Sequence, residues 1–424
     1  DLLVEDLTQG SGALRSKLPT LLEKCELLMK VADEYRIQTE ESAAWNDEFL
    51  SQRNSLANEA HRVDAERDDR IRQKFGVMVR KLSLTQGISK VQRDIFPVFE
   101  AQLPADANEK VSVWVRDGWS IDENSVRADA RQAGNQSPTV FVYVPKRSAD
   151  DLRHYLIDFK AASATLDKRG VPNTPEGTEA RSAMETTKQA AESKIRELLQ
   201  EAYSGARVFQ GGGNEILGTD LQEMTLEAAT NALQRLYPQF HVADHAGWTK
   251  VYDKAQKGAP DALKSVGDEG EPAKNPVCKA ILAYIAGGKK GIDIRKNFEG
   301  ATYGWPGDAV DGGLQVLLVA GLVRAQDEKG QTIDPKDLER KVIGKTMFKV
   351  ESATVSAAQR IQIRKVLQKV GLTAKQGEEL AYVPQFLVSA QELANRAGGD
   401  APRPARPATA GLEGIRLTAG NEQL

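Results

Sequence analysis

Two histidines come nearest to a metal-binding pattern in this sequence. His241 and His245 are four residues apart, so they could share one face of a helix, as paired zinc ligands do. The sequence has no HExxH pattern and no cysteine pair, and no third ligand stands beside them. We therefore interpret both as surface or interface histidines and predict no metal site.

Three carboxylates form the next candidate. Asp117, Asp122 and Glu123 follow a β-branched segment, and clustered carboxylates can hold a metal ion or act as acid and base. No metal-binding motif accompanies them. Acidic residues are also common in turns and in the first turn of a helix. We predict that these three form a turn and begin a helix.

Two glycine-rich segments could in principle hold a phosphate. Gly287–Gly291 and Gly211–Gly213 both lack the G-x-x-x-x-G-K-[S/T] spacing that lets backbone amides surround a phosphate. We interpret the first as the end of a helix and the second as a turn that ends a strand. The sequence also has no nucleophile elbow and no kinase signature set. It therefore predicts neither an enzyme active site nor a bound cofactor.

Basic residues are the last candidates, and their chemistry would be contact with DNA phosphates. The net charge of the chain is −3, so such a site must be local. The side chains that we predict as DNA contacts are Lys289, Lys290, Arg295, Lys296, Lys345, Lys349, Arg360 and Arg364.

The elements that would position most of these residues are those of a winged helix-turn-helix. The order is three short helices and then a two-stranded ribbon. The helices are predicted over 276–286, over 292–298 and from Trp305-Pro306 onward, and the ribbon over 323–325 and 346–350. Apolar residues at spacings of three and four carry the helix predictions.

The predicted third helix is poorly suited to reading DNA sequence. In a helix-turn-helix its early turns reach base edges. Here those turns carry Asp308, Asp311, Gly312, Gly313 and Gln315, and carboxylates repel phosphates. Two alternatives remain open. The domain docks on the DNA backbone through its second helix and wing, or it is a protein-contact module that keeps the fold without nucleic acid.

The predicted fold class is mixed α/β and helix-rich, with a helical arm, a small α/β layer and the winged helix. The predicted regions are a helical region at 1–108, an α/β layer at 109–215, a helical connector at 216–275, the winged helix at 276–355, C-terminal helices at 356–398 and a flexible tail at 399–424.

Long helices dominate the predicted helical region. An amphipathic helix is expected from Pro19 to Tyr35. A second, highly charged pattern runs from Thr39 to about residue 82, without glycine or proline before Gly76. Such a narrow apolar stripe is typical of a long arm or coiled coil, and an ordinary helical bundle is the alternative.

Strands and helices alternate in the predicted α/β layer. Strands are expected over 111–116, 139–144 and 206–210, and helices over 123–133, 150–166 and 179–202. This alternation predicts a short, mostly parallel sheet. The second strand is almost continuously apolar, so we expect it to be covered on both faces.

The composition is that of a globular protein of two to four domains. The chain has 424 residues, of which 40% are hydrophobic and 28% charged. The two cysteines, Cys25 and Cys278, lie in apolar helical patterns and are predicted to be buried thiols, and their scarcity indicates the cytoplasm. No apolar run is long enough to span a membrane, and no signal peptide is apparent. The chain begins with Asp1, so we expect it to be part of a longer protein.

Eight stretches with uncommon combinations of Trp, Gly and Pro carry a resemblance. They are Val113–Trp119, Ser137–Val144, Gly205–Gly213, Leu236–Phe240, Asp244–Trp248, Pro276–Lys279, Tyr303–Pro306 and Gln359–Lys365. Together they resemble the C-terminal part of the large P-loop protein of bacteriophage-exclusion (BREX) systems, the BrxC or PglY family. The resemblance spans roughly residues 110–400.

The resemblance implies a role in phage defence. Proteins of this family are AAA-like ATPases that act with a DNA methyltransferase, a phosphatase-like protein and a smaller partner. Their Walker motifs lie upstream of the region resembled, so ATP and Mg²⁺ are expected only there. For this chain the resemblance implies a cytoplasmic, non-catalytic portion that assembles with those partners and docks on double-stranded DNA. Self-association is a further expectation. A protein-interaction scaffold without nucleic-acid contact is the alternative.

Overall fold

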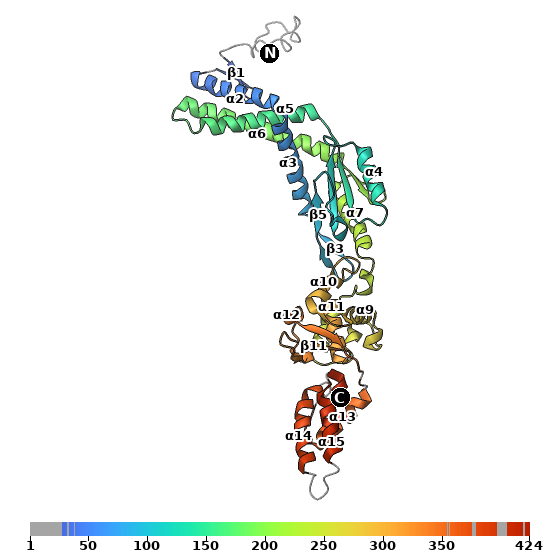
Figure 1. Cartoon of the computed structure of the whole chain (residues 1–424). Helices are drawn as coiled ribbons and strands as arrows, with labels where there is room; N and C mark the ends of the chain where they lie inside the picture. The colour runs from blue at the N-terminus through green and yellow to red at the C-terminus, as the bar shows by residue number, and fades with distance from the viewer. Residues whose placement is uncertain are drawn as a thin grey trace. The chain divides into compact units, whose positions relative to one another are not determined.

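The chain is helix-rich, with 60% of the computed structural model in helices and with small mixed sheets, so its class is mixed α/β (Figure 1). The structure describes residues 28–31, 34–37, 39–353, 355, 357–374, 379–396, 405–418 and 420–424. The chain divides into two compact units. The first comprises Asp1–Ser83, Ile95–Ala107 and Ser112–Ala229, and the second comprises Leu84–Asp94, Asn108–Val111 and Thr230–Leu424.

The first described element of unit 1 is a β-hairpin. Strand β1 (Leu28–Val31) pairs antiparallel with β2 (Glu34–Ile37). The predicted helix from Pro19 to Tyr35 is therefore wrong from Leu28 onward, and its earlier residues lie outside the described part. The valine, tyrosine and isoleucine of this segment favour strands, and that preference outweighs the helical spacing of its apolar residues.

The charged pattern after Thr39 forms two helices instead of one. Helix α2 spans Glu40–Asn58, α3 spans Ala60–Val79, and Glu59 separates them. The Thr39 hydroxyl accepts a hydrogen bond from the Ser42 amide at 3.1 Å, and the Thr39 amide donates to the Ser42 hydroxyl at 2.6 Å. The start of α2 is therefore capped. No glycine or proline marks the break at Glu59 in the sequence.

Helix α2 does not stand alone as an arm. It packs side by side with α5 (Ala149–Arg169) and α6 (Pro175–Ser204), as Figure 1 shows. The residues buried at this junction are Trp45, Ala162, Leu166, Ala180 and Met184. Helix α2 is therefore one member of a group of three packed helices.

Five strands form the sheet of unit 1, in the order β5-β6-β7-β8-β9. They are β5 (Ile95–Val98), β6 (Val111–Asp117), β7 (Val140–Val144), β8 (Arg207–Gln210) and β9 (Glu215–Ile216). Strands β6 and β7 are parallel and are joined by α4 (Glu123–Ala133). All five residues of β7 are buried, which confirms that both faces of this strand are covered.

The prediction of a mostly parallel sheet is wrong for the later strands. β8 runs antiparallel to β7, and β9 runs antiparallel to β8. The reason is the pair of long helices between β7 and β8. A single helix returns the chain to the starting end of a strand, whereas α5 and α6 together bring it back to the end where β7 finished. β8 must then run in the opposite direction.

Unit 2 begins with connecting elements. They are the hairpin β3 (Leu84–Gln86) and β4 (Val91–Arg93), the last part of α7 (Leu221–Leu236), the short helix α8 (Trp248–Gln256) and the 3₁₀ turns η2 (Phe240–Val242), η3 (Ala262–Val266) and η4 (Pro272–Lys274). Asp244 ties the hairpin to this segment, because its carboxylate accepts hydrogen bonds from the amides of Ile88 at 2.9 Å and Ser89 at 2.8 Å.

The central part of unit 2 packs helices against a small antiparallel sheet. Its elements are α9 (Pro276–Ile285), β10 (Lys289–Lys290), α10 (Gly291–Glu299), α11 (Gly307–Val319), β11 (Val323–Gln326), β12 (Thr332–Ile333), η5 (Pro335–Asp337), α12 (Arg340–Ile343) and β13 (Met347–Val350). The strand order is β10-β13-β11-β12. The core of this part centres on α11, where Val310, Leu314 and Leu317 have no exposed surface.

The C-terminal part of unit 2 is helical. It contains α13 (Ala357–Lys369), η6 (Glu379–Tyr382), α14 (Val383–Arg396), α15 (Ala405–Arg416) and η7 (Gly420–Gln423). The predicted flexible tail at 399–424 is therefore wrong for α15 and η7. Leu412 of α15 is buried with Val383 and Leu387 of α14, so apolar packing orders a segment that its Pro, Ala and Gly content suggested was loose.

One of the two cysteines can be checked. Cys278, on α9, is fully buried, which confirms the prediction for this thiol, and burial raises its pKa to about 12. Cys25 lies outside the described residues. Among the helices that are described, none is both long and apolar enough to cross a membrane.

Candidate functional site

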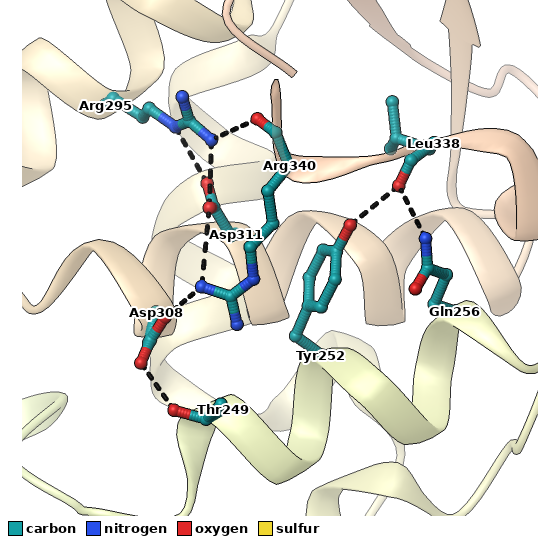
Figure 2. A network of polar contacts seen from close by, with 8 residues as sticks. All are labelled: Thr249, Tyr252, Gln256, Arg295, Asp308, Asp311, Leu338 and Arg340. Carbon is teal, nitrogen blue, oxygen red and sulfur yellow. Dashed lines mark hydrogen bonds and ion pairs between the residues drawn. The ribbon is translucent and has the colours of Figure 1, made fainter. Parts of the chain in front are cut away.

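The beginning of α11 carries a network of two carboxylates and two arginines (Figure 2). Asp311 accepts hydrogen bonds from Arg295 of α10, at 2.8 Å from Nε and 2.9 Å from Nη2. The same Nη2 donates to the backbone oxygen of Arg340 at 3.0 Å. The Arg340 guanidinium in turn pairs with Asp308 and lies 4.0 Å from the carboxylate of Asp311.

Helix α8 is fastened to this network along one of its faces. The Thr249 hydroxyl donates to Asp308 at 2.5 Å. Tyr252 and Gln256, three and seven residues further on, donate to the backbone oxygen of Leu338 at 2.8 and 3.4 Å, as Figure 2 shows. Spacings of three and four place these side chains on one side of a helix. Helix α8 is therefore tied both to α11 and to the segment between β12 and β13.

Burial and neighbouring cations have opposite effects on the pKa of each of the two carboxylates. Only 7% of the Asp311 side chain is exposed, and its burial raises the pKa of this group in spite of Arg295. Burial would also raise the pKa of Asp308, but the hydrogen bonds from Thr249 and Arg340 outweigh that effect and lower it. The network as a whole is neutral, because two arginines balance two carboxylates.

Two adjacent glycines allow helices to approach α11 from two sides. A Cβ atom on Gly312 would lie 3.1 Å from Cε3 of Trp248, the first residue of α8. A Cβ atom on Gly313 would lie 2.7 Å from Cδ1 of Ile281 in α9. Neither position has room for a larger side chain without movement of its neighbour. The glycines of the predicted third helix thus serve helix packing.

The segment after β12 covers a further part of α11. Gln315, which has no exposed surface, donates from its side-chain nitrogen to the backbone oxygen of Pro335. Every residue from 309 to 318 is buried. The helix that a helix-turn-helix would insert into the DNA groove is therefore enclosed by the chain itself.

Three of the eight predicted DNA contacts are engaged in ion pairs. Arg295 holds Asp311, as described above. Arg360 lies 3.1 Å from Glu379, and Arg364 pairs with the same carboxylate. The Glu379 side chain has no exposed surface, so it needs these arginines to stay charged. The guanidinium groups at 295, 360 and 364 have structural partners and are not free to contact phosphates.

Four of the remaining lysines are brought together. Lys289 pairs in register with Phe348, and Lys290 pairs with Met347, so β10 lies beside the strand that carries Lys349. Lys345 precedes that strand by two residues. We call Lys289, Lys290, Lys345 and Lys349 the lysine edge. The eighth predicted contact, Lys296, is exposed on α10.

The other candidates from the sequence have structural roles. Asp117 accepts hydrogen bonds from the amides of Trp119 and Ser120, and Asp122 caps α4, which confirms a turn and a helix start. The segment Gly211–Gly213 forms the turn between β8 and β9, with positive φ at two of its glycines. Among the described residues, no group of three or more His, Cys, Asp or Glu side chains could hold a metal ion.

Sequence reasoning missed the partners that enclose α11. Thr249, Tyr252 and Arg340 contact residues that are 59, 86 and 32 positions away in the chain. No local pattern encodes such pairings. The one signal in the sequence was the presence of carboxylates in an otherwise apolar helix. Such carboxylates indicate cationic partners elsewhere in the chain, because buried acids require them.

Comparison with known proteins provides no relative: no family model, no curated protein and no solved structure matches this chain.

The Asp311–Arg295 pair gives a test of this arrangement. Replacing Asp311 with alanine leaves a half-buried arginine without its carboxylate. We expect the free energy of unfolding in urea to fall by about 3 kcal/mol, as when one partner of a buried ion pair is removed. Asp293→Ala, at an exposed position on α10, is the control and should cost no more than about 1 kcal/mol. Equal losses for the two variants would contradict the network.

Proposed function

We propose that this chain is a non-catalytic assembly module in which residues 276–355 form a winged helix that contacts proteins and not DNA sequence. The order α9, β10, α10, α11 and then an antiparallel ribbon agrees with such a domain. The observation that carries the proposal is the burial of α11 from residue 309 to 318. A helix that is covered by its own chain has no surface with which to enter a groove.

Electrostatics support the same proposal. A DNA-reading domain presents arginine or lysine to base edges and phosphates. Here the two arginines nearest to α11 are paired with Asp308 and Asp311, so they offer no net charge to an external anion. Breaking the Arg295 pair to reach a phosphate would leave the buried carboxylate of Asp311 without its partner, which is costly.

Exposed apolar side chains support a protein partner. In the C-terminal part of unit 2 five aliphatic side chains are between 45% and 88% exposed: Ile361, Val366, Val388, Leu393 and Leu417. Exposed apolar side chains mark contact sites where they gather into one patch, and two of these five lie on the same helix, α14. With the resemblance to the BrxC/PglY family, we propose that the partners are BREX proteins, among them the methyltransferase and the phosphatase-like protein, and that nucleotide chemistry belongs to an upstream part.

Docking on the DNA backbone is the second candidate. The lysine edge favours it, because four cationic residues gather where β10 meets β13. Lysines bind phosphates without reading sequence, and such binding weakens steeply with salt. This contact would use the side of the domain that carries β10 and would leave α11 enclosed.

A salt series of duplex-DNA binding distinguishes the two candidates. The parent chain and a Lys289/Lys290/Lys345/Lys349→Ala variant are compared by fluorescence anisotropy. We expect both to bind more weakly than about 10⁻⁴ M at physiological salt, the weak limit of non-specific binding. Suppose instead that the parent binds more tightly than this limit at physiological salt, that its affinity rises as salt is lowered, and that the variant loses both affinity and salt slope. DNA docking then replaces the protein-contact proposal.

A second experiment tests the protein contact directly. We expect the parent to co-elute in size-exclusion chromatography with a purified methyltransferase or phosphatase-like protein of a BREX system. A Val388→Asp/Leu393→Asp variant should lose this co-elution, because it places charge on exposed apolar surface. Glu392→Ala, at an exposed charged position on the same helix, is the control. Co-elution that survives the double substitution would contradict the role of the C-terminal helices.

A further inference from the structure

Unit 2 contains a cavity of about 200 Å³ beside the end of α11. Its walls include Leu318 from that helix, Val323 and Arg324 from β11, and Ile333 and Pro335 from the β12 side. Strand β12 is the last strand of the sheet, so the cavity lies at a sheet edge and not inside the core. An apolar cavity of about 150 Å³ can hold a benzene ring, so this one has room for a ring-sized group.

The charge at this cavity is unbalanced at Arg324. Val323 and Ala325 on either side of it are buried, so Arg324 points to the other face of the sheet. Directly opposite on β13 stands Lys349. Like charges that face each other across two strands destabilise a sheet. In the part of the chain that the structure describes, neither cation forms an ion pair with a carboxylate.

Arg324 also has an unsatisfied donor. Its Nε atom is buried and has no hydrogen-bond partner. Four basic residues and two acidic residues line the cavity: Lys257, Arg324, Lys336, Arg360, Asp334 and Glu351. Of these, Arg360 is engaged with Glu379, and Glu351 accepts a hydrogen bond from the amide of Asn421 at 3.0 Å. A buried donor without a partner is costly, whereas an anion at this position would satisfy the donor and the charge together.

From these observations we propose that the cavity binds a carboxylate or phosphate group carried on an apolar body, with Arg324 as the contact for the anion. The apolar walls of Leu318, Val323, Ile333 and Pro335 receive the body of the ligand. Lys349 adds attraction from the neighbouring strand. This site shares Lys349 with the lysine edge and does not depend on the proposed protein contact.

Benzoate and phenyl phosphate are the probes, with benzyl alcohol as the neutral analogue and inorganic phosphate as the anion without an apolar body. Binding to the whole chain is measured by ligand-observed NMR and calorimetry. We expect at least one aromatic anion to bind, and to bind more tightly than either comparison compound. The tighter of the two anions identifies the preferred group.

Two substitutions test the site from different directions. Arg324→Gln removes the anion contact and should weaken binding by about tenfold or more, as expected for a charged hydrogen bond. Thr332→Trp, at an exposed position of β12 that lines the cavity, should block it by filling the space. Lys329→Gln, in the β11–β12 turn and outside the cavity, is the matched control and should leave binding unchanged.

Three results would overturn the inference. The first is a folded parent that binds neither aromatic anion at millimolar concentration. The second is equal affinity in the parent and in Arg324→Gln. The third is benzyl alcohol or inorganic phosphate binding as tightly as the aromatic anions. If Arg324→Gln fails to fold, as judged by circular dichroism, Thr332→Trp decides the outcome.

Discussion

The burial of α11 is the constraint on which unit 2 depends. The helix carries a buried carboxylate, Asp311, and a partly exposed one, Asp308. Both are paired with cations, and the pairing matters most for Asp311, because an unpaired buried charge costs several kcal/mol. Arg295 and Arg340 supply those cations from two other elements, and Gly312 and Gly313 provide the space for α8 and α9. Close packing thus joins α8 and α9 to α11, and charge neutralisation joins α10 and α12 to the same helix.

This constraint sorts the cations of unit 2 into two groups. Arg295 and Arg340 neutralise α11, and Arg360 and Arg364 neutralise the buried Glu379, so their charges are used within the fold. Among the described residues, the lysine edge, Lys296 and Arg324 form no ion pair with a carboxylate, and we propose that the lysine edge and Arg324 serve external partners. A domain whose order of elements suggests DNA recognition is therefore left with a helix that cannot reach a groove. The order of helices and strands in a domain does not by itself decide its function.

Local patterns in the sequence predicted single elements well. Asp122 followed by an amphipathic stretch gave α4 with the bounds that the structure has, and the prolines and apolar spacing of 276–319 gave α9, α10 and α11. The break at Glu59 was not predicted, because no glycine or proline marks it in the sequence. The direction of β8 was not predicted, because it depends on how α5 and α6 return the chain to the sheet. The site was the least predictable part, because ion pairs such as Arg340–Asp308 join residues far apart in the sequence, which no spacing rule connects.

Hydrogen–deuterium exchange of the α11 amides tests the central claim most directly, in the presence and absence of duplex DNA. An enclosed helix exchanges only through larger unfolding events, so residues 309–318 should be among the slowest in unit 2. Their rates should not change when DNA is added. Fast exchange in this helix, or protection that appears only with DNA, would contradict the account, because α11 would then be open to a groove.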